Sequence, residues 1–110
     1  MNFWATWCGP CLAEMPDFEA EWQARKNRDL VVIGVAMDWD QAAEVMKYAT
    51  ARGVHYPIVL GNDDIAADIA GATGVAGLPA TFVFDPKGKL RYSGVGKIDR
   101  AKLTQMTNAP

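Results

Sequence analysis

Segments typical of strands and segments typical of helices alternate along this chain, and the alternation restricts its fold more than any other feature. The clearest strand is the continuous apolar run Leu30–Ala36, which is typical of a strand buried on both faces of a parallel sheet. Helical patterns precede and follow it, and the whole order is β-α-β-α-β-α-β-β-α. Parallel strands need crossover connections, so we expect an α/β fold with a mixed sheet, helices on both faces and a final antiparallel hairpin.

Turn and capping residues set the expected boundaries of these elements. The strands are predicted at residues 2–5, 30–36, 56–60, 80–84 and 90–93, and the helices at 8–26, 40–52, 62–71 and 99–106. Asp40, Asn62 (or Asp63) and Asp99 stand where N-caps are needed. Pro16 lies inside the first helix and should kink it.

Length and charge restrict the class of protein. The chain has 110 residues, 50% of them hydrophobic and 22% charged, which suits one folded domain spanning residues 1–110. Its net charge of −2 offers no basic surface for nucleic acid. The longest apolar run is far shorter than the roughly 20 residues of a membrane span. The first basic residue is Arg25, so we expect no signal peptide in these residues. A membrane anchor is expected only if further sequence precedes Met1.

The only two cysteines lie in the segment Trp7-Cys8-Gly9-Pro10-Cys11. A disulfide across so short a loop restricts the unfolded chain little, so it is a poor structural cross-link. A zinc site would need about four ligands, and neither His55 nor any carboxylate stands at a zinc-finger spacing. We therefore expect no metal and no cofactor, only a reversible dithiol/disulfide pair.

The position of the cysteines supports redox chemistry. Apolar residues at helical spacing follow them, so Cys8 should start a helix, whose unpaired N–H groups and dipole favour a thiolate. Pro10 suits the first turn, and Gly9 keeps the approach to the sulfur open. Cys11, one turn further on the same face, can reach Cys8 and resolve a mixed disulfide.

Two segments carry a resemblance to a known family. Residues Asn2–Cys11, followed by Glu14, resemble the thioredoxin superfamily, and more narrowly the TlpA/ResA-like branch of bacterial periplasmic thiol–disulfide oxidoreductases. Gly77–Asp85 is similar to the second signature of that family, and the extra strand and helix between Asp40 and Gly71 match this branch. The resemblance implies a thioredoxin-like three-layer fold with an inserted strand–helix unit.

The resemblance also implies roles for individual residues. Cys8 would be the attacking, exposed cysteine and Cys11 the buried, resolving one. Pro79 matches the cis-proline of the family, and the backbone of Leu78 would pair with a substrate segment as an added strand. Substrate contact is thus expected at Trp7, Gly9, Pro10, Leu78 and Pro79. Trp7 has a second interpretation, a large aromatic that covers the edge of the core.

Glu14 has two interpretations. Its sequence context alone indicates a solvated helix residue. The resemblance places it near the dithiol, where it would accept or relay the proton of Cys11. Asn2 supports the second interpretation, because plain thioredoxins carry a buried aspartate there and asparagine cannot titrate. Glu14 is the nearest alternative acceptor in the sequence.

We expect a protein-disulfide reductase that acts on disulfides or dithiols of partner proteins and is reduced again by an upstream electron donor. The Gly-Pro pair between the cysteines matches reducing thioredoxins, with potentials near about −270 mV. In the resembled branch, partners include apocytochrome c and its maturation machinery. The resemblance also implies that the domain lies in the periplasm, or on a membrane anchor facing it. The alternative is a binding module of this fold with little turnover. A peroxiredoxin fits less well, because no cysteine stands in a Thr-x-x-Cys setting.

The start of the chain leads to a further expectation. Strands and a hairpin that precede the dithiol helix in the resembled family are absent, so the domain is expected to lack its N-terminal strands. Either apolar edges of residues 30–36 and 80–84 are then exposed, or a second copy supplies the missing strand in a homodimer.

The remaining candidate residues have structural interpretations. His55 should lie on the surface, and Trp39 should pack against the fold. Asp63, Asp64 and Asp68 are expected at a helix start and on its solvent face, without a metal.

Overall fold

The computed structural model describes residues 1–37, 41–71 and 75–108 of the chain. The described strands are β1 (Asn2–Trp4), β2 (Gly34–Ala36), β3 (Ile58–Leu60), β4 (Ala80–Phe84) and β5 (Leu90–Val95). The described helices are α1 (Gly9–Arg25), α2 (Ala42–Ala51), α3 (Asp63–Ala70) and α4 (Arg100–Thr107). The expected roles of Trp39 and Asp40 fall outside the described residues.

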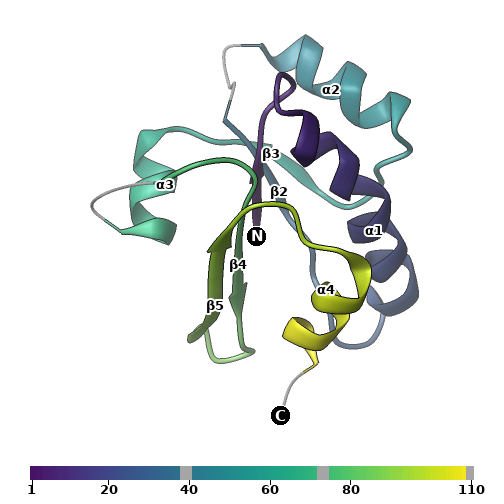
Figure 1. Ribbon diagram of the computed structural model, residues 1–110, viewed down its shortest axis with the longest axis vertical. Coiled ribbons are helices and arrows are strands. Elements are labelled where there is room, and N and C mark those ends of the chain that lie inside the picture. The colour runs from purple at the N-terminus through teal and green to yellow at the C-terminus, as the bar shows by residue number, and fades with distance from the viewer. Residues whose placement is uncertain (38–40, 72–74, 109–110) are drawn as a thin grey trace.

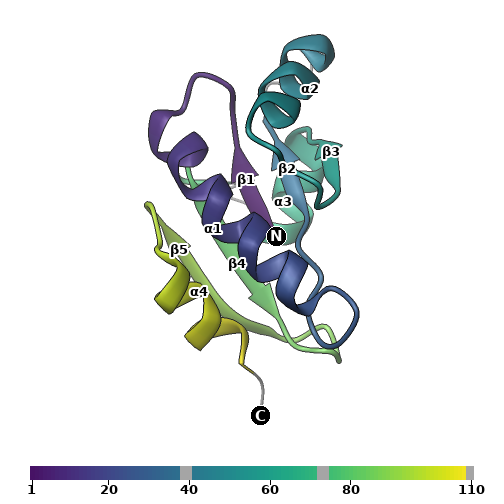
Figure 2. The ribbon, with the colours of Figure 1, turned by 90° about the vertical axis from the view of Figure 1, so that its right-hand side faces the viewer.

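The strands form one mixed sheet in the order β3-β2-β1-β4-β5. Strand β2 is parallel to β1 and β3, whereas β4 is antiparallel to β1 and β5. Helices α1, α2 and α4 lie on one side of the sheet and α3 on the other (Figures 1 and 2). The predicted three-layer α/β architecture is confirmed, and β1 occupies the centre of the sheet.

The side chains of β1 serve both faces of the sheet in turn. Phe3 packs on the α3 side, with its ring 5.6 Å from that of Phe82 in an edge-to-face arrangement. Trp4 belongs to the opposite core, with Met15 of α1 and Val45 of α2. Successive side chains of a strand point to opposite faces of the sheet, so β1 packs against both cores. The strand thereby fixes the start of α1 against the centre of the sheet.

The apolar run Leu30–Ala36 is only partly a strand. Strand β2 covers its last three residues, and Val31 is 71% exposed. Asn2, the first residue of β1, is level with Gly34, so β1 offers no residue opposite the earlier part of the run. A strand needs a neighbour for its backbone groups, and an apolar pattern does not supply one.

Exposed strand edges were also expected at residues 30–36 and 80–84, and this holds for part of each range, because residues 30–33 precede β2 and the pairing of β4 on its β1 side stops at Phe82. Strand β2 lies between β1 and β3, and β4 lies between β1 and β5. An apolar groove of about 920 Å³ does open beside them, beyond the start of β1. We call it the strand groove; its walls include Met1, residues 30–33, residues 82–84, Leu103 and Met106.

Local signals set several helix boundaries as predicted. The side chain of Asn62 accepts from the amide of Ile65 at 2.9 Å, and that of Asp99 accepts from the amide of Lys102 at 2.8 Å. Both are N-cap bonds. Helix α1 begins after Cys8 and continues through Pro16 to Arg25.

Candidate active site

The two cysteines form a disulfide at the N-terminus of α1. Cys8 is the N-cap residue, and its Sγ accepts a hydrogen bond from the amide of Cys11 at 3.3 Å. Cys8 is 5% exposed and Cys11 is fully buried. When the disulfide is reduced, an amide donor and the helix dipole both favour a thiolate at Cys8. Cys8 is buried and not exposed as expected, although it is the less buried of the two cysteines and the one that caps the helix.

The surface around the disulfide is open. Trp7 is 74% exposed, so it does not cover the core, and the second interpretation of this residue is wrong. Gly9 and Pro10 are exposed, and a Cβ atom on Gly9 would meet nothing within 4 Å. The residues on either side of Cys8 are thus exposed, although Cys8 itself is 5% exposed.

The segment that precedes β4 carries the residues that were expected beside the disulfide. The peptide bond between Leu78 and Pro79 is cis, and Pro79 is buried. Leu78 is half-buried and packs against the apolar cluster that contains both cysteines. The carbonyl of Pro79 accepts from the amide of Gly96 at 2.8 Å, which ties this segment to the loop before α4. The structure thus places Leu78 against the apolar cluster of the two cysteines, with the cis peptide bond to Pro79 directly after it.

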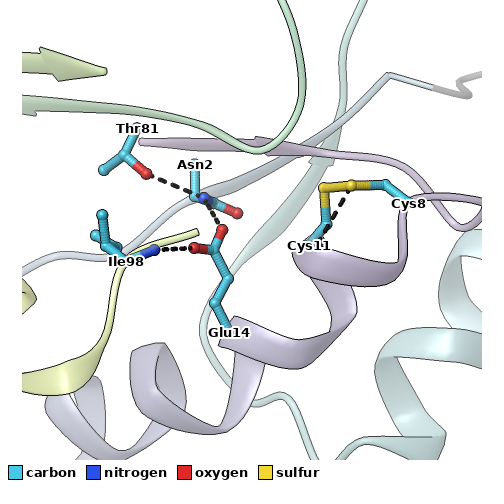
Figure 3. Close-up of a disulfide and its surroundings, with 6 residues drawn as sticks. All are labelled: Asn2, Cys8, Cys11, Glu14, Thr81 and Ile98. Carbon is cyan, nitrogen blue, oxygen red and sulfur yellow. Dashed lines mark hydrogen bonds between the residues drawn. A yellow bond between two sulfur atoms is a disulfide. The ribbon is translucent and has the colours of Figure 1, made fainter. Parts of the chain in front are cut away.

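Glu14 lies on the inner face of α1 and is completely buried, so the prediction of a solvated residue is wrong. Its Oε1 accepts from Nδ2 of Asn2 at 2.7 Å, and its Oε2 accepts from the amide of Ile98 at 3.2 Å (Figure 3). Burial raises the pKa of Glu14 from 4.5 to about 6, although both hydrogen bonds and the charge of Lys97 oppose the rise. A carboxyl group that titrates near neutrality thus lies one turn from Cys11 on the same helix.

Two residues of the hydrogen-bonded cluster around Glu14 were not predicted from the sequence as site residues. Thr81 accepts a second hydrogen bond from Nδ2 of Asn2 at 3.3 Å, and Ile98 contributes its amide from the loop before α4. Asn2 was noted only as a residue that cannot titrate. The signal for this cluster was a polar residue at the start of a central strand, because a buried amide requires partners.

The other candidate residues lie on the surface, as predicted. His55 is exposed, and its Nδ1 is 3.0 Å from Oε2 of Glu19. The side chains of Asp63, Asp64 and Asp68 face solvent on α3.

The fold and the site together define a class of protein. A mixed sheet is flanked by helices on both faces, a Cys-x-x-Cys disulfide begins the helix that follows the central strand, and a cis-proline directly precedes β4. These are the features of a thioredoxin-like redox domain. Residues 1–109 match the sequence profile of the Redoxin family, and the chain belongs to that family.

Curated relatives agree with this assignment. The chain is 33% identical over 108 residues to the thiol-disulfide oxidoreductase ResA of Bacillus subtilis, and 30% identical over 105 residues to ResA of Geobacillus thermodenitrificans. These matches cover 98% and 96% of this chain but 58% of each relative. The chain therefore spans little more than half the length of the curated relatives it matches.

Solved structures show the same fold. A thiol:disulfide interchange protein of the thioredoxin family from Chlorobium tepidum TLS superposes with a TM-score of 0.87 at 29% identity, over 96% of this chain and 74% of that one. A thioredoxin-related protein from Neisseria meningitidis serogroup B gives a TM-score of 0.79 at 30% identity, over 96% and 78% of the two chains. The resemblance drawn from the sequence is confirmed.

Among the residues that the structure describes, every helix is too short or too polar to span a bilayer.

Proposed function

We propose that this domain reduces disulfides in partner proteins through the Cys8/Cys11 pair. The observation that carries the proposal is the asymmetry of the pair at the start of α1. Cys8 keeps a small exposed fraction and its sulfur receives an amide hydrogen bond, whereas Cys11 is fully buried. An attacking thiolate needs access and stabilisation of its charge, and a resolving thiol needs only to reach the attacking sulfur.

The reaction follows from this arrangement in two steps. In the reduced domain, the Cys8 thiolate attacks one sulfur of the partner disulfide, forming a mixed disulfide and releasing the other partner sulfur as a thiolate. Cys11 then gives its proton to Glu14 and attacks Cys8 Sγ, which forms the Cys8–Cys11 bond and releases the second partner thiolate. Two electrons pass to the partner, and an upstream dithiol donor restores the reduced domain.

Glu14 suits the role of proton acceptor by its place and its acidity. It follows Cys11 by three residues, so the two share one face of α1. Burial raises the pKa of Glu14 to about 6, which makes the carboxylate a stronger base than an exposed one while leaving it ionised at neutral pH. Of the two carboxylates nearest to Cys11 on α1, Glu14 faces the core and Asp17 does not.

The partner is proposed to bind as an extended segment over the surface around Cys8. Leu78 would pair with its backbone, and exposed Trp7, Gly9 and Pro10 would contact its side chains. By resemblance to the ResA-like branch, we place the domain outside the cytoplasm, in the periplasm or facing it, with proteins of cytochrome c maturation as one class of partner. The reducing direction rests on the Gly9-Pro10 pair.

Reduction of insulin, together with a redox titration against glutathione, tests activity and direction. We expect turnover with a chemical reductant and a potential near about −270 mV, the value of reducing thioredoxins. A potential near about −120 mV would overturn the reducing direction.

A trapping experiment distinguishes this enzyme from a binding module of the same fold. In Cys11→Ser, the mixed disulfide cannot be resolved, so covalent complexes through Cys8 should accumulate. Cys8→Ser is the matched control and should give none. Reversible complexes alone, in both variants, would support the binding module.

A further inference from the structure

The side-chain amide of Asn2 is fixed by two bonds. Asn2 lies at the start of β1 and is buried, and its Nδ2 donates to Glu14 Oε1 at 2.7 Å and to Thr81 Oγ1 at 3.3 Å. An amide nitrogen carries two hydrogens, and these two acceptors use both. An ionised carboxylate only accepts hydrogen bonds, so the nitrogen, and not the oxygen, of the amide must face Glu14.

We propose that Asn2 is a positioning residue for Glu14, fixing its carboxylate between β1 and the loop before α4 and setting the pH at which it accepts the proton of Cys11. The inference rests on the proposed function. Asn2 takes no part in bond making or breaking. Thr81 completes the arrangement, because its hydroxyl holds the second hydrogen of the amide and so fixes the rotation of the Asn2 side chain.

Hydrogen bonds from two groups stabilise the charge of Glu14. Among the described residues, the carboxylate accepts one hydrogen bond from Asn2 and one from the main chain of Ile98 (Figure 3). A main-chain amide is present whatever the side chain at that position. Of these two donors, only the Asn2 amide depends on the side chain and can be removed by a substitution. Hydrogen bonds to an ionised group stabilise it more than neutral ones do.

The surrounding charges cannot replace this donor. Lys97, in the loop before α4, favours the Glu14 anion, but its side chain is exposed and its effect is screened by salt. Asp17, on α1 itself, opposes the anion. Tyr56, from the segment before β3, faces the same region, and burial together with the charges of Glu14 and Glu19 raises the pKa of its hydroxyl, so it stays neutral. Strands β1 and β4 contribute the neutral side chains of Asn2 and Thr81.

The position also connects the acceptor to the partner-binding segment. Thr81 lies two residues after Pro79, and the loop that supplies the Ile98 amide also donates from Gly96 to the carbonyl of Pro79. Glu14 is thus held by one group from β1 and one from the loop before α4. The first is hydrogen-bonded to β4 through Thr81, and the loop is hydrogen-bonded to Pro79 through Gly96. Small shifts in this segment would move the donors of Glu14.

The test compares Asn2→Leu, which keeps the volume but removes the donor, with the wild-type domain. The first readout is the titration of the Glu14 carboxyl carbon by NMR in the oxidised domain, where no thiol titrates. The second is the rate of the Cys11-dependent phase, from pH 5 to 9, when the reduced domain meets a fluorescent peptide disulfide. We expect both midpoints to rise by about one pH unit, because the anion loses a charge-assisted bond.

Two further variants serve as controls. In Asn2→Asp, two carboxylates would share the site and should bind one proton between them, so the Glu14 midpoint should rise further. Lys97→Gln should shift it less, and its effect should disappear in 0.5 M salt or so, whereas the effect of Asn2→Leu should persist. Should Asn2→Leu fail to fold, Thr81→Val tests the same arrangement, with a smaller shift in the same direction.

The Glu14→Gln background separates this inference from the proposed function. There, Asn2→Leu should leave the pH profile of the Cys11-dependent phase unchanged, because the group through which it acts is gone. A similar shift in both backgrounds, or no shift of the Glu14 titration in Asn2→Leu, would overturn the positioning role. If Glu14→Gln itself leaves the rate profile unchanged, the proposed proton acceptor is wrong, while the NMR titration still decides whether Asn2 controls the acidity of Glu14.

Discussion

The environment of Glu14 differs from the one that its neighbours in the sequence predict. The spacing of Cys8 and Cys11 determines that the two sulfurs meet, since both lie within one helical turn. The burial of Glu14 depends instead on Asn2 and Ile98, which lie 12 and 84 residues away. No pattern along α1 contains that information. The resemblance to a family supplied the place of Glu14 near the dithiol, and the tertiary structure supplied its hydrogen-bond partners.

The burial of Glu14 has a measurable cost in stability. Because the folded state raises the pKa of Glu14 from 4.5 to about 6, it binds the proton more tightly than the unfolded chain does. The stability contribution of the protonated group is complete below pH 4.5 or so and is lost as the pH rises through about 6. At about 1.4 kcal/mol for each pH unit, the loss is about 2 kcal/mol.

We therefore predict that Glu14→Gln removes this loss. Urea denaturation of the oxidised domain from pH 4 to 7 should show wild-type stability falling by about 2 kcal/mol relative to Glu14→Gln. The difference between the two proteins cancels the titration of other groups. Glu44→Gln, on the exposed face of α2, is the matched control and should parallel the wild type. Parallel curves for wild type and Glu14→Gln would contradict the raised pKa.

At the level of elements, local signals were sufficient where an element is stabilised locally. Helices α3 and α4 begin at the N-caps predicted from Asn62 and Asp99, because a cap bond spans three residues. The strand predicted over Leu30–Ala36 failed in its first half, because strand formation depends on a neighbour that the run itself does not contain. The hairpin of β4 and β5 was predictable, since both partners and the turn are adjacent in sequence.

The contact between α1 and α4 depends on charges that the sequence pattern did not reveal. Glu21 is buried on α1, and its Oε1 accepts from Nε of Arg100 at 3.0 Å and from Oγ1 of Thr104 at 2.7 Å. Its Oε2 accepts from Nη1 of Arg25 at 3.2 Å. Arg25 is itself buried and also donates to the carbonyl of Thr107 at 2.9 Å. One carboxylate thus joins the two helices.

We predict that Glu21→Gln destabilises the domain by about 2 kcal/mol, because it removes one of the two charged partners of the buried Arg25 guanidinium; the other, Asp29, remains, with its Oδ1 3.0 Å from Nε. Urea denaturation at pH 7 measures the loss. Arg91→Gln is the control: it breaks the exposed pair with Asp85, whose atoms are 3.1 Å apart, and should cost less than about 1 kcal/mol. Equal losses in the two variants would mean that the buried network does not hold α4 on α1.

At the level of the whole molecule, the alternation of elements predicted the layers and the mixed sheet, but not the strand groove. The groove lies in line with β1, between residues 30–33 and residues 82–84. The ammonium of Met1 donates to the carbonyl of Phe82 at 2.6 Å, and the amide of Phe82 donates to the carbonyl of Met1 at 2.8 Å. The pairing with β4 therefore continues to the first residue. The expected homodimer through this part of the sheet stays a prediction, which sedimentation checks.

The charge of Met1 at the head of the groove leads to a further expectation. Burial lowers the pKa of its ammonium from 8.0 to about 6, so the unfolded chain binds this proton more tightly than the folded domain. Stability should therefore rise between about pH 6 and pH 8, by up to about 3 kcal/mol, in the direction opposite to the effect of Glu14. A peptide bond at this nitrogen would carry the same donor without the charge.

We predict that a five-residue extension of alternating valine and threonine, added before Met1, enters the groove as an extended strand. Any neutral extension should abolish the rise in stability between pH 6 and 8, because it removes the buried ammonium. Only the valine-containing one should add stability beyond that, by about 3 kcal/mol if two valines are buried, and it should compete with dimerisation. An extension of glycine and serine of equal length is the control, compared by urea denaturation and sedimentation at pH 6 and 8. Equal stability of the two extended proteins would mean that the groove does not accept a strand.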